Sequence, residues 1–244
     1  GQIEHFASLA PDALRSFEQA RELAERAGDL RLQALAWAWI ASLHGNAARY
    51  EALVDALNRA LQLAAPDDHG SHARALLALA DAEMAAGWNE RAALHYQQVH
   101  RHATTEGDLA MIAMLTYNRA AHQAHALALA DAFGQADTGA AWRVLIEAES
   151  SQRLDQGIGN NALSALTPLI RARLCTVLQR WDEAIELFDA FMDQGQREGL
   201  SHGYAHLQVT RAWCLWQVGR VVAAADGLAQ AQHGVDAQRD ADDR

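Results

Sequence analysis

The sequence predicts an all-α protein of about eleven helices, stacked as antiparallel pairs in a curved solenoid. Alanine and leucine dominate its 244 residues while β-branched residues are scarce, and apolar positions recur at intervals of three and four, as amphipathic helices require. Longer and shorter interruptions of this pattern alternate along the chain, and a small residue recurs about every forty residues. Half of the residues are apolar, which is ample for a buried core.

Glycine and aspartate mark the interruptions and allow the helices to be placed in order. Longer breaks such as residues 27–29 and 106–108 contain Gly-Asp and separate the pairs. The shorter breaks, within the pairs, contain Gly45, Gly87 and Gly219. The helices expected from this pattern span residues 12–27, 30–45, 49–64, 71–86, 89–104, 108–133, 138–153, 166–178, 181–196, 202–218 and 221–233.

Residues 1–233 are expected to form one repeat domain, because each pair has an apolar face that it cannot bury alone. Residues 234–244 are polar and acidic, and we expect a frayed tail or a linker there. No apolar run is long enough to span a membrane and no signal peptide precedes the first helix, so the chain is expected to be cytoplasmic. The leading Gly1 fits a cleavage scar on a fragment of a longer protein.

The register of the repeat follows from alanines that we expect where the two helices of a pair approach closely. They recur at intervals of 39, 40, 52 and 40 residues, so one repeat carries roughly a dozen extra residues. These alanines are Ala41, Ala80, Ala120, Ala172 and Ala212. The second helices share a small-x3-large-x2-small pattern, which begins at Ala13, Ala92, Ala141, Ala184 and Ala224, and more loosely at Leu53.

Two segments resemble the tetratricopeptide repeat. Trp37-x2-Ile40-Ala41, with Pro66 near the end of the repeat, is similar to the first half of that family's signature, and Arg180 to Phe188 (RWDEAIELF) is similar to its turn and second helix. The resemblance implies a right-handed superhelix whose concave wall, made by first helices, binds a protein or peptide. The chain departs from the family in its period, about forty instead of thirty-four residues, and in Ala replacing Gly. Longer repeats of this kind are similar to helical regions of bacterial regulators of the maltose-regulator type and of sensor proteins.

The resemblance also implies which residues face the binding groove, by counting from the close-contact alanines. The resulting wall mixes apolar and aromatic anchors with a few charges, which suits an extended peptide or a partner helix. For two of these residues, Trp213 and Trp216, the alternative is a core position against a following repeat. The groove residues implied are Arg74, Asp81, Tyr117, His125, Arg173, His206, Trp213 and Trp216.

The charge composition excludes several functions. All twenty basic residues are arginine, and a P-loop, a pyridoxal Schiff base and an amine nucleophile all require lysine. A net charge of −11 argues against direct binding of nucleic acid, because phosphate backbones are held by clustered cations. We therefore expect no cofactor and no catalysis.

Two motifs of enzymes occur in helical contexts that do not support them. Gly199-Leu200-Ser201-His202-Gly203 matches a nucleophile elbow, but no strand precedes it, and Ser201 is expected to cap a helix. Residues 157–162 loosely match a dinucleotide fingerprint, again without a βαβ unit.

Histidine and cysteine patterns favour structural roles over a metal site. His122/His125 and His202/His206 lie at helical spacings, and His69 and His72 flank a helix start, but no third and fourth ligand follows at a characteristic spacing. Surface or capping roles are therefore favoured, with no metal. The isolated Cys175 and Cys214 are expected to be reduced core thiols.

The third pair contains most of the extra residues. Its first helix is expected to be about two turns longer than the others, either as a tolerated insertion or as a binding or dimerisation element. The leading interpretation of the whole chain is a non-catalytic protein-interaction or sensor module of a bacterial regulatory protein. The alternative is a receptor for a small ligand or peptide that controls an attached output domain. Homodimerisation is compatible with both.

Overall fold

Aspartate and glycine at the helix junctions explain where many of the helices begin and end. Gly107 ends one helix in the left-handed conformation, with φ 73°. Asp108 then caps the next helix by accepting a hydrogen bond from the Met111 amide at 2.9 Å. Asp29 and Asp68 cap two other helices in the same way. The Gly-Asp junctions therefore act as predicted: the glycine ends one helix and the aspartate caps the start of the next.

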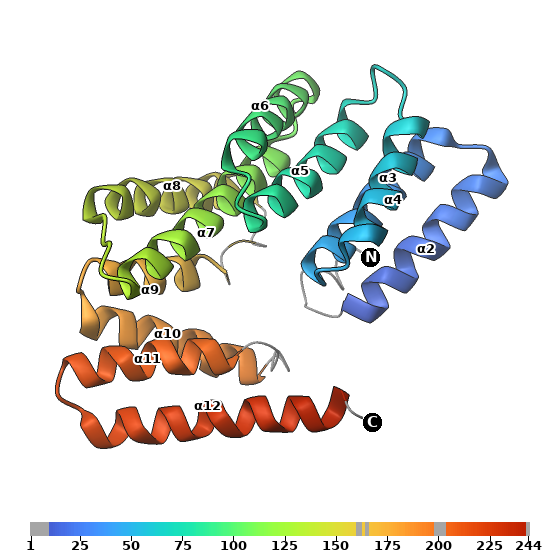
Figure 1. The fold of residues 1–244 in the computed structure, drawn as a ribbon. Helices are drawn as coiled ribbons and strands as arrows, with labels where there is room; N and C mark the ends of the chain where they lie inside the picture. The colour runs from blue at the N-terminus through green and yellow to red at the C-terminus, as the bar shows by residue number, and fades with distance from the viewer. Residues whose placement is uncertain (1–9, 160–162, 164–165, 198–203, 243–244) are drawn as a thin grey trace. The chain divides into compact units, whose positions relative to one another are not determined.

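The computed structural model describes residues 10–159, 163, 166–197 and 204–242. These residues form eleven α-helices and no strand, so the all-α prediction is confirmed, and none of the helices is long and apolar enough to cross a membrane. We call α3, α5, α7, α9 and α11 first helices, and α2, α4, α6, α8, α10 and α12 second helices. The helices are α2 (Ala10–Ala27), α3 (Leu30–Asn46), α4 (Tyr50–Leu63), α5 (His69–Ala85), α6 (Asn89–Glu106), α7 (Leu109–Ala132), α8 (Thr138–Gly157), α9 (Thr167–Val177), α10 (Trp181–Arg197), α11 (Tyr204–Gln217) and α12 (Val221–Asp242) (Figure 1).

The chain divides into two compact units. The first comprises Gly1–His122 and Ser151–Ala162, and the second comprises Gln123–Ser150 and Leu163–Arg244. The boundary falls within α7 and α8, which contribute residues to both units. The expectation of a single repeat domain over residues 1–233 stays a prediction.

In the first unit, α3 packs against α4 and α5 against α6, and α3 also contacts α2 and α5. One apolar cluster surrounds Trp39 and Leu53, and a second surrounds Leu77, Tyr96 and Val99. Helices α3, α4 and α5 therefore contact both their own partner and a neighbouring pair, which fits stacked helix pairs.

In the second unit, α10 packs against α9 and α11, and α11 lies beside α12 (Figure 1). Phe188 and Leu215 are central to its core. Cys175 and Cys214 are both free and buried in this core, as expected. Burial raises the pKa of both thiols, that of Cys175 to about 11, so both carry their protons at neutral pH.

The alanine register predicted from the sequence is confirmed by burial. All five close-contact alanines are fully or almost fully buried, as are the first small residues of the pattern in the second helices. Two later positions of that pattern are wrong. Leu228 is 49% exposed because α12 buries Gly227 instead, and a Cβ at Gly227 would lie 3.4 Å from the Ala212 side chain. Ala20 is also exposed, while Ala24 is buried one turn later.

Several helix boundaries differ from the prediction; helix α8, for example, ends at Gly157 instead of residue 153. Gly45 lies inside α3, where a side chain would collide with Leu53, and the left-handed residue of that turn is Ala48, with φ 55°. Helix α9 begins at Thr167, one residue later than predicted, and the Thr167 hydroxyl donates to the Leu163 carbonyl. Helix α12 continues to Asp242, nine residues beyond the predicted end.

The extra length of the third pair is confirmed. Helix α7 has 24 residues, whereas α3 and α5 have 17 each. The excess of seven residues is about two helical turns. Its left-handed glycine, Gly134, accordingly follows Ala120 by fourteen residues, whereas Gly87 follows Ala80 by seven.

Candidate functional site

The first helices of the first unit place a buried arginine next to a tryptophan. Arg74, on α5, is only 8% exposed. Its guanidinium carbon lies 3.9 Å from the centre of the Trp39 ring, whose indole is also stacked on Phe17. One guanidinium nitrogen donates to the Met114 sulfur at 3.1 Å. Three first helices, α3, α5 and α7, thus meet at this cation.

Asp81, seven residues further along α5, is held by hydrogen bonds from two other helices. Tyr96 donates its hydroxyl to one carboxylate oxygen at 2.7 Å, and the Asn118 side chain donates to the other at 2.6 Å. His122 Nε2 lies 3.7 Å from the first oxygen. Asp81 and Arg74 share one face of α5, because seven residues are close to two full turns. Together these residues form the α5 site, defined by Arg74, Asp81, Trp39, Met114, Tyr96, Asn118 and His122.

Burial changes the acidity of the groups in the α5 site. It lowers the pKa of Arg74 to about 10, against the opposing influence of Asp108 and Asp81. It raises the pKa of Asp81 to about 6, although the Tyr96 and Asn118 hydrogen bonds favour the ionised form. Burial also raises the pKa of the Tyr96 hydroxyl and lowers that of His122. Burial therefore disfavours the ionised forms of both Arg74 and Asp81.

In the second unit, the predicted groove residues of α11 form an exposed aromatic surface. Trp213 and Trp216 are 47% and 54% exposed, and their ring centres lie 5.1 Å apart with the planes tilted by 33°. Both indoles therefore lie outside the core of the described residues, and a core position against a following repeat stays an untested alternative. Arg173, on α9, lies with its guanidinium nitrogen 2.9 Å from Nε2 of His206, on α11. We call Arg173, His206, Trp213 and Trp216 the α11 face.

The two remaining predicted groove residues lie on α7. Tyr117 is half-buried in the first unit, next to Asn118, and His125 is exposed in the second unit. The sequence prediction thus contained two members of the α5 site, Arg74 and Asp81. It did not assign Trp39 or Asn118 to a site, because neither has a motif of its own. The only available signal was their position, two residues before a close-contact alanine in each case.

The repeated arginines that precede the alanines of the later first helices bind carboxylates. Arg171 lies 3.4 Å from the Glu183 carboxylate on α10, and Arg211 pairs with Asp189, also on α10. These two arginines therefore link neighbouring helices through ion pairs.

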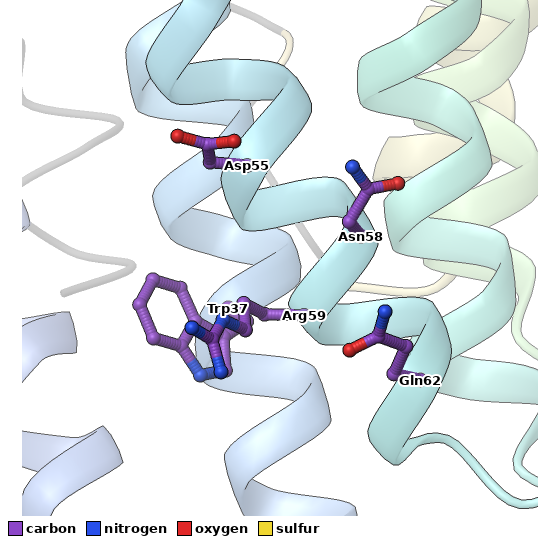
Figure 2. A pocket seen from close by; sticks show the side chains of 5 residues that line it. All are labelled: Trp37, Asp55, Asn58, Arg59 and Gln62. Atoms are coloured by element: carbon purple, nitrogen blue, oxygen red, sulfur yellow. The ribbon is translucent and has the colours of Figure 1, made fainter.

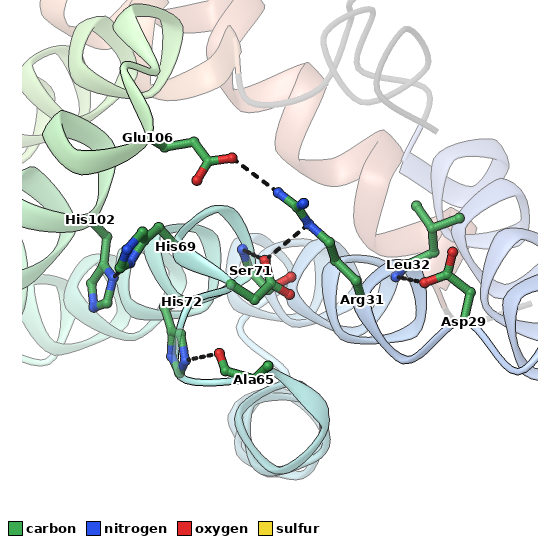
Figure 3. Close-up of polar contacts among 10 residues, drawn as sticks. Asp29, Arg31, Leu32, Ala65, His69, Ser71, His72, His102 and Glu106 are labelled. Carbon is green, nitrogen blue, oxygen red and sulfur yellow. Dashed lines mark hydrogen bonds and ion pairs between the residues drawn. The ribbon is translucent and has the colours of Figure 1, made fainter.

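Histidines gather where α5 begins and α6 ends (Figure 3). His69 and His102 place their Nδ1 atoms 3.0 Å apart, and the His72 ring is stacked on His102. Nearby, Arg31 bridges the carboxylates of Asp68 and Glu106. Within the part of the chain that the structure describes, no group of three or more His, Cys, Asp or Glu residues is placed to hold a metal. These contacts tie helix ends together.

A polar hollow of about 540 Å³ lies between Trp37 of α3 and one face of α4 (Figure 2). Four of its lining residues come from α4. They follow one another at helical spacing, with the later three lying three, four and seven residues after the first, and all four are exposed. An open hollow of this kind encloses little of a ligand, whereas small-molecule sites bury most of theirs. The lining residues from α4 are Asp55, Asn58, Arg59 and Gln62.

The two enzyme-like motifs gain no structural support. The Gly199–Gly203 segment, which includes His202, lies outside the described residues. Of the dinucleotide-like segment, Gly157 ends α8 and Gly159 is in the turn that follows, so a helix and not a strand precedes it. No protein-family model matches the chain, and a search of curated proteins found no match.

Proposed function

We propose that the chain is a non-catalytic, cytoplasmic interaction or sensor module of the tetratricopeptide kind, from a bacterial regulatory protein. In this proposal its helix pairs form a right-handed superhelix, and first helices bind a protein or peptide. The stacked pairs, the buried alanine register and the extended third pair support such an architecture.

The observation that carries the proposal is the exposed indole pair of the α11 face. Tryptophan dominates the energy of many interfaces when a partner desolvates it. Two indoles on one helix face offer a peptide an apolar anchor, and the Arg173 guanidinium beside His206 offers a polar contact elsewhere on the α11 face. Their exposure also means that the fold does not need their side chains for its core.

The test compares two double variants within the second unit. Peptides are first selected from a random-sequence library on the wild-type chain. Trp213→Ala/Trp216→Ala should then weaken their binding more than tenfold, about 1.4 kcal/mol, and leave the helicity and Tm nearly unchanged. The matched control, Val221→Ala/Val222→Ala, removes two exposed apolar side chains from α12 and should leave the affinity unchanged. Unchanged affinity in the tryptophan variant, or a large loss of Tm, would contradict the proposal.

The second candidate function is a receptor that binds a small ligand or peptide and controls an attached output domain. The α5 site favours it, because Arg74 and Asp81 place a guanidinium and a carboxylate, each with unused hydrogen-bonding capacity, on one face of α5. A ligand that binds the folded chain should raise the Tm in proportion to its occupancy. The chemistry that such a ligand would need can be inferred from the site itself.

A further inference from the structure

Arg74 is a buried cation without an anionic partner. Among the residues that the structure describes, no carboxylate lies within ion-pair distance of its guanidinium, and its partners are a thioether and an aromatic ring. A thioether is a weak acceptor, and a guanidinium has five donors arranged in a planar fork. The remaining guanidinium nitrogens of Arg74 are not among the fully buried polar atoms that lack a partner, so they are open to an anion that the chain does not supply.

We propose that Arg74 and Asp81 form a two-point site for an amphoteric peptide, with Arg74 binding a carboxylate and Asp81 binding a cationic group. This inference rests on the proposed function, and it names the chemistry of the ligand that the first unit of the chain would bind. The two residues lie on one face of α5, separated along the axis by about 10 Å, since each residue adds about 1.5 Å. An extended peptide spans that distance with about three residues.

Asp81 retains the capacity to accept a further donor. A carboxylate has about four acceptor positions, and Tyr96 and Asn118 occupy one on each oxygen. These two hydrogen bonds fix the orientation of the carboxylate. The side chain of Asp81 is still 24% exposed, which leaves access for a ligand's ammonium or guanidinium group.

The surrounding charges favour a zwitterion over a dianion. Asp81 and Asp108 both act electrostatically on Arg74, so a doubly charged phosphate would be repelled by two carboxylates as it approached. A peptide that presents one carboxylate and one cation meets a complementary charge at each end. The net charge of −11 adds to the discrimination against polyanions.

The experiment titrates the full chain, labelled with 15N at arginine side chains, with trialanine. The Arg74 Nε–H resonance is identified by its loss in Arg74→Met. Trialanine with both termini free should shift this resonance, while C-terminal amidation and N-terminal acetylation should each weaken binding at least about tenfold. Inorganic phosphate at equal concentration should not compete. No shift up to the solubility limit, equal binding of the blocked peptides, or equally strong binding of phosphate would each overturn the proposal.

Variants separate the two contacts. Arg74→Met should abolish the preference for a free carboxylate, and Asp81→Asn the preference for a free amino terminus, with binding then followed by calorimetry. Arg59→Met, which removes an exposed arginine from α4, should change neither preference. Should Arg74→Met fail to fold, Arg74→Lys must retain a weakened carboxylate preference, and a complete loss there would count against the site. The result does not depend on the α11 face, so failure here and failure of the proposed function are distinguishable.

Arg74→Met also distinguishes a ligand site from a structural role. Methionine keeps a long apolar side chain against Trp39 and removes a buried charge that has no anionic partner. The Tm should therefore stay the same or rise, because replacing a poorly compensated buried charge by an apolar residue is often stabilising. A large fall in Tm together with an unchanged preference for the free carboxylate would show that Arg74 serves the fold alone.

Discussion

The first helices α5 and α11 have the same register but carry different chemistry at equivalent positions. Arg74 lies six residues before the buried Ala80, and His206 lies six residues before the buried Ala212. Arg74 is buried, whereas His206 is exposed and has the Arg173 guanidinium beside it. The register thus determines on which face of its helix a side chain lies. The neighbouring helices determine how deeply that side chain is buried.

The residues that directly follow these alanines differ in the same way. Asp81 follows Ala80 and receives hydrogen bonds from Tyr96 on α6 and from α7. Trp213 follows Ala212 and remains about half exposed, with Trp216 as its aromatic neighbour. One repeat position can therefore support a partly buried polar network in one unit and an open aromatic surface in another.

The largest expected effect tests whether the register is shared by the two units. Ala80→Leu and Ala172→Leu each insert a branched side chain at a fully buried contact, and each should lower the free energy of unfolding by about 1 to 3 kcal/mol. The controls Ala93→Leu and Ala225→Leu are at exposed positions and should have little effect. Urea unfolding measures all four. An unchanged stability at either buried position would show that its register is wrong.

A smaller effect, at most about 2 kcal/mol, should appear as a pH dependence that is specific to the α5 site. The folded state raises the pKa of Asp81 to about 6, so between about pH 4 and 6 it binds this proton more tightly than the unfolded chain does. Asp81 should therefore contribute more favourably to stability as the pH falls from 7 to 4, an effect that Asp81→Asn removes.

Unfolding of the wild type and of Asp81→Asn is measured across this range, and the wild type should gain relative to the variant at the acidic end. His122 also titrates nearby but is present in both proteins, and burial lowers its pKa. Asp67→Asn, at an exposed position, is the matched control. A constant difference in stability between wild type and Asp81→Asn would contradict the raised pKa of Asp81.

The smallest effect concerns the turns within the pairs. Gly87 and Gly219 adopt left-handed conformations with φ near 78°, and Gln179 holds the equivalent position with φ 57°. Gly219→Ala should cost about 1 kcal/mol, because a Cβ is unfavourable there. Gln179→Gly should be neutral or stabilising by less than about 1 kcal/mol, because relief of strain is offset by a more flexible unfolded chain. Thermal unfolding of both variants measures these two changes in stability. A higher Tm for Gly219→Ala would contradict the prediction for that turn.

The sequence by itself determined the helices, their order and the buried alanines. Helical periodicity, Gly-Asp junctions and the recurrence of small residues are local signals, and they depend on spacings of a few residues. Counting from the close-contact alanines placed Arg74 and Asp81 on one face of α5, and it assigned the residues of the α11 face to the groove. It failed at α12, where Gly227 and not Leu228 is buried, because only the crossing point against Ala212 decides which residue must be small.

Only the tertiary structure decided what each groove residue contacts. Asp81 and Asn118 are 37 residues apart, and Arg74 and Met114 are 40 apart. No local pattern encodes such pairs, because their distance depends on how α5, α6 and α7 pack. The same holds for the exposure of Trp213 and Trp216, which the sequence left open between core and surface. Periodicity fixes the face of a helix, while burial, hydrogen bonding and pKa follow from the residues that other helices bring to it.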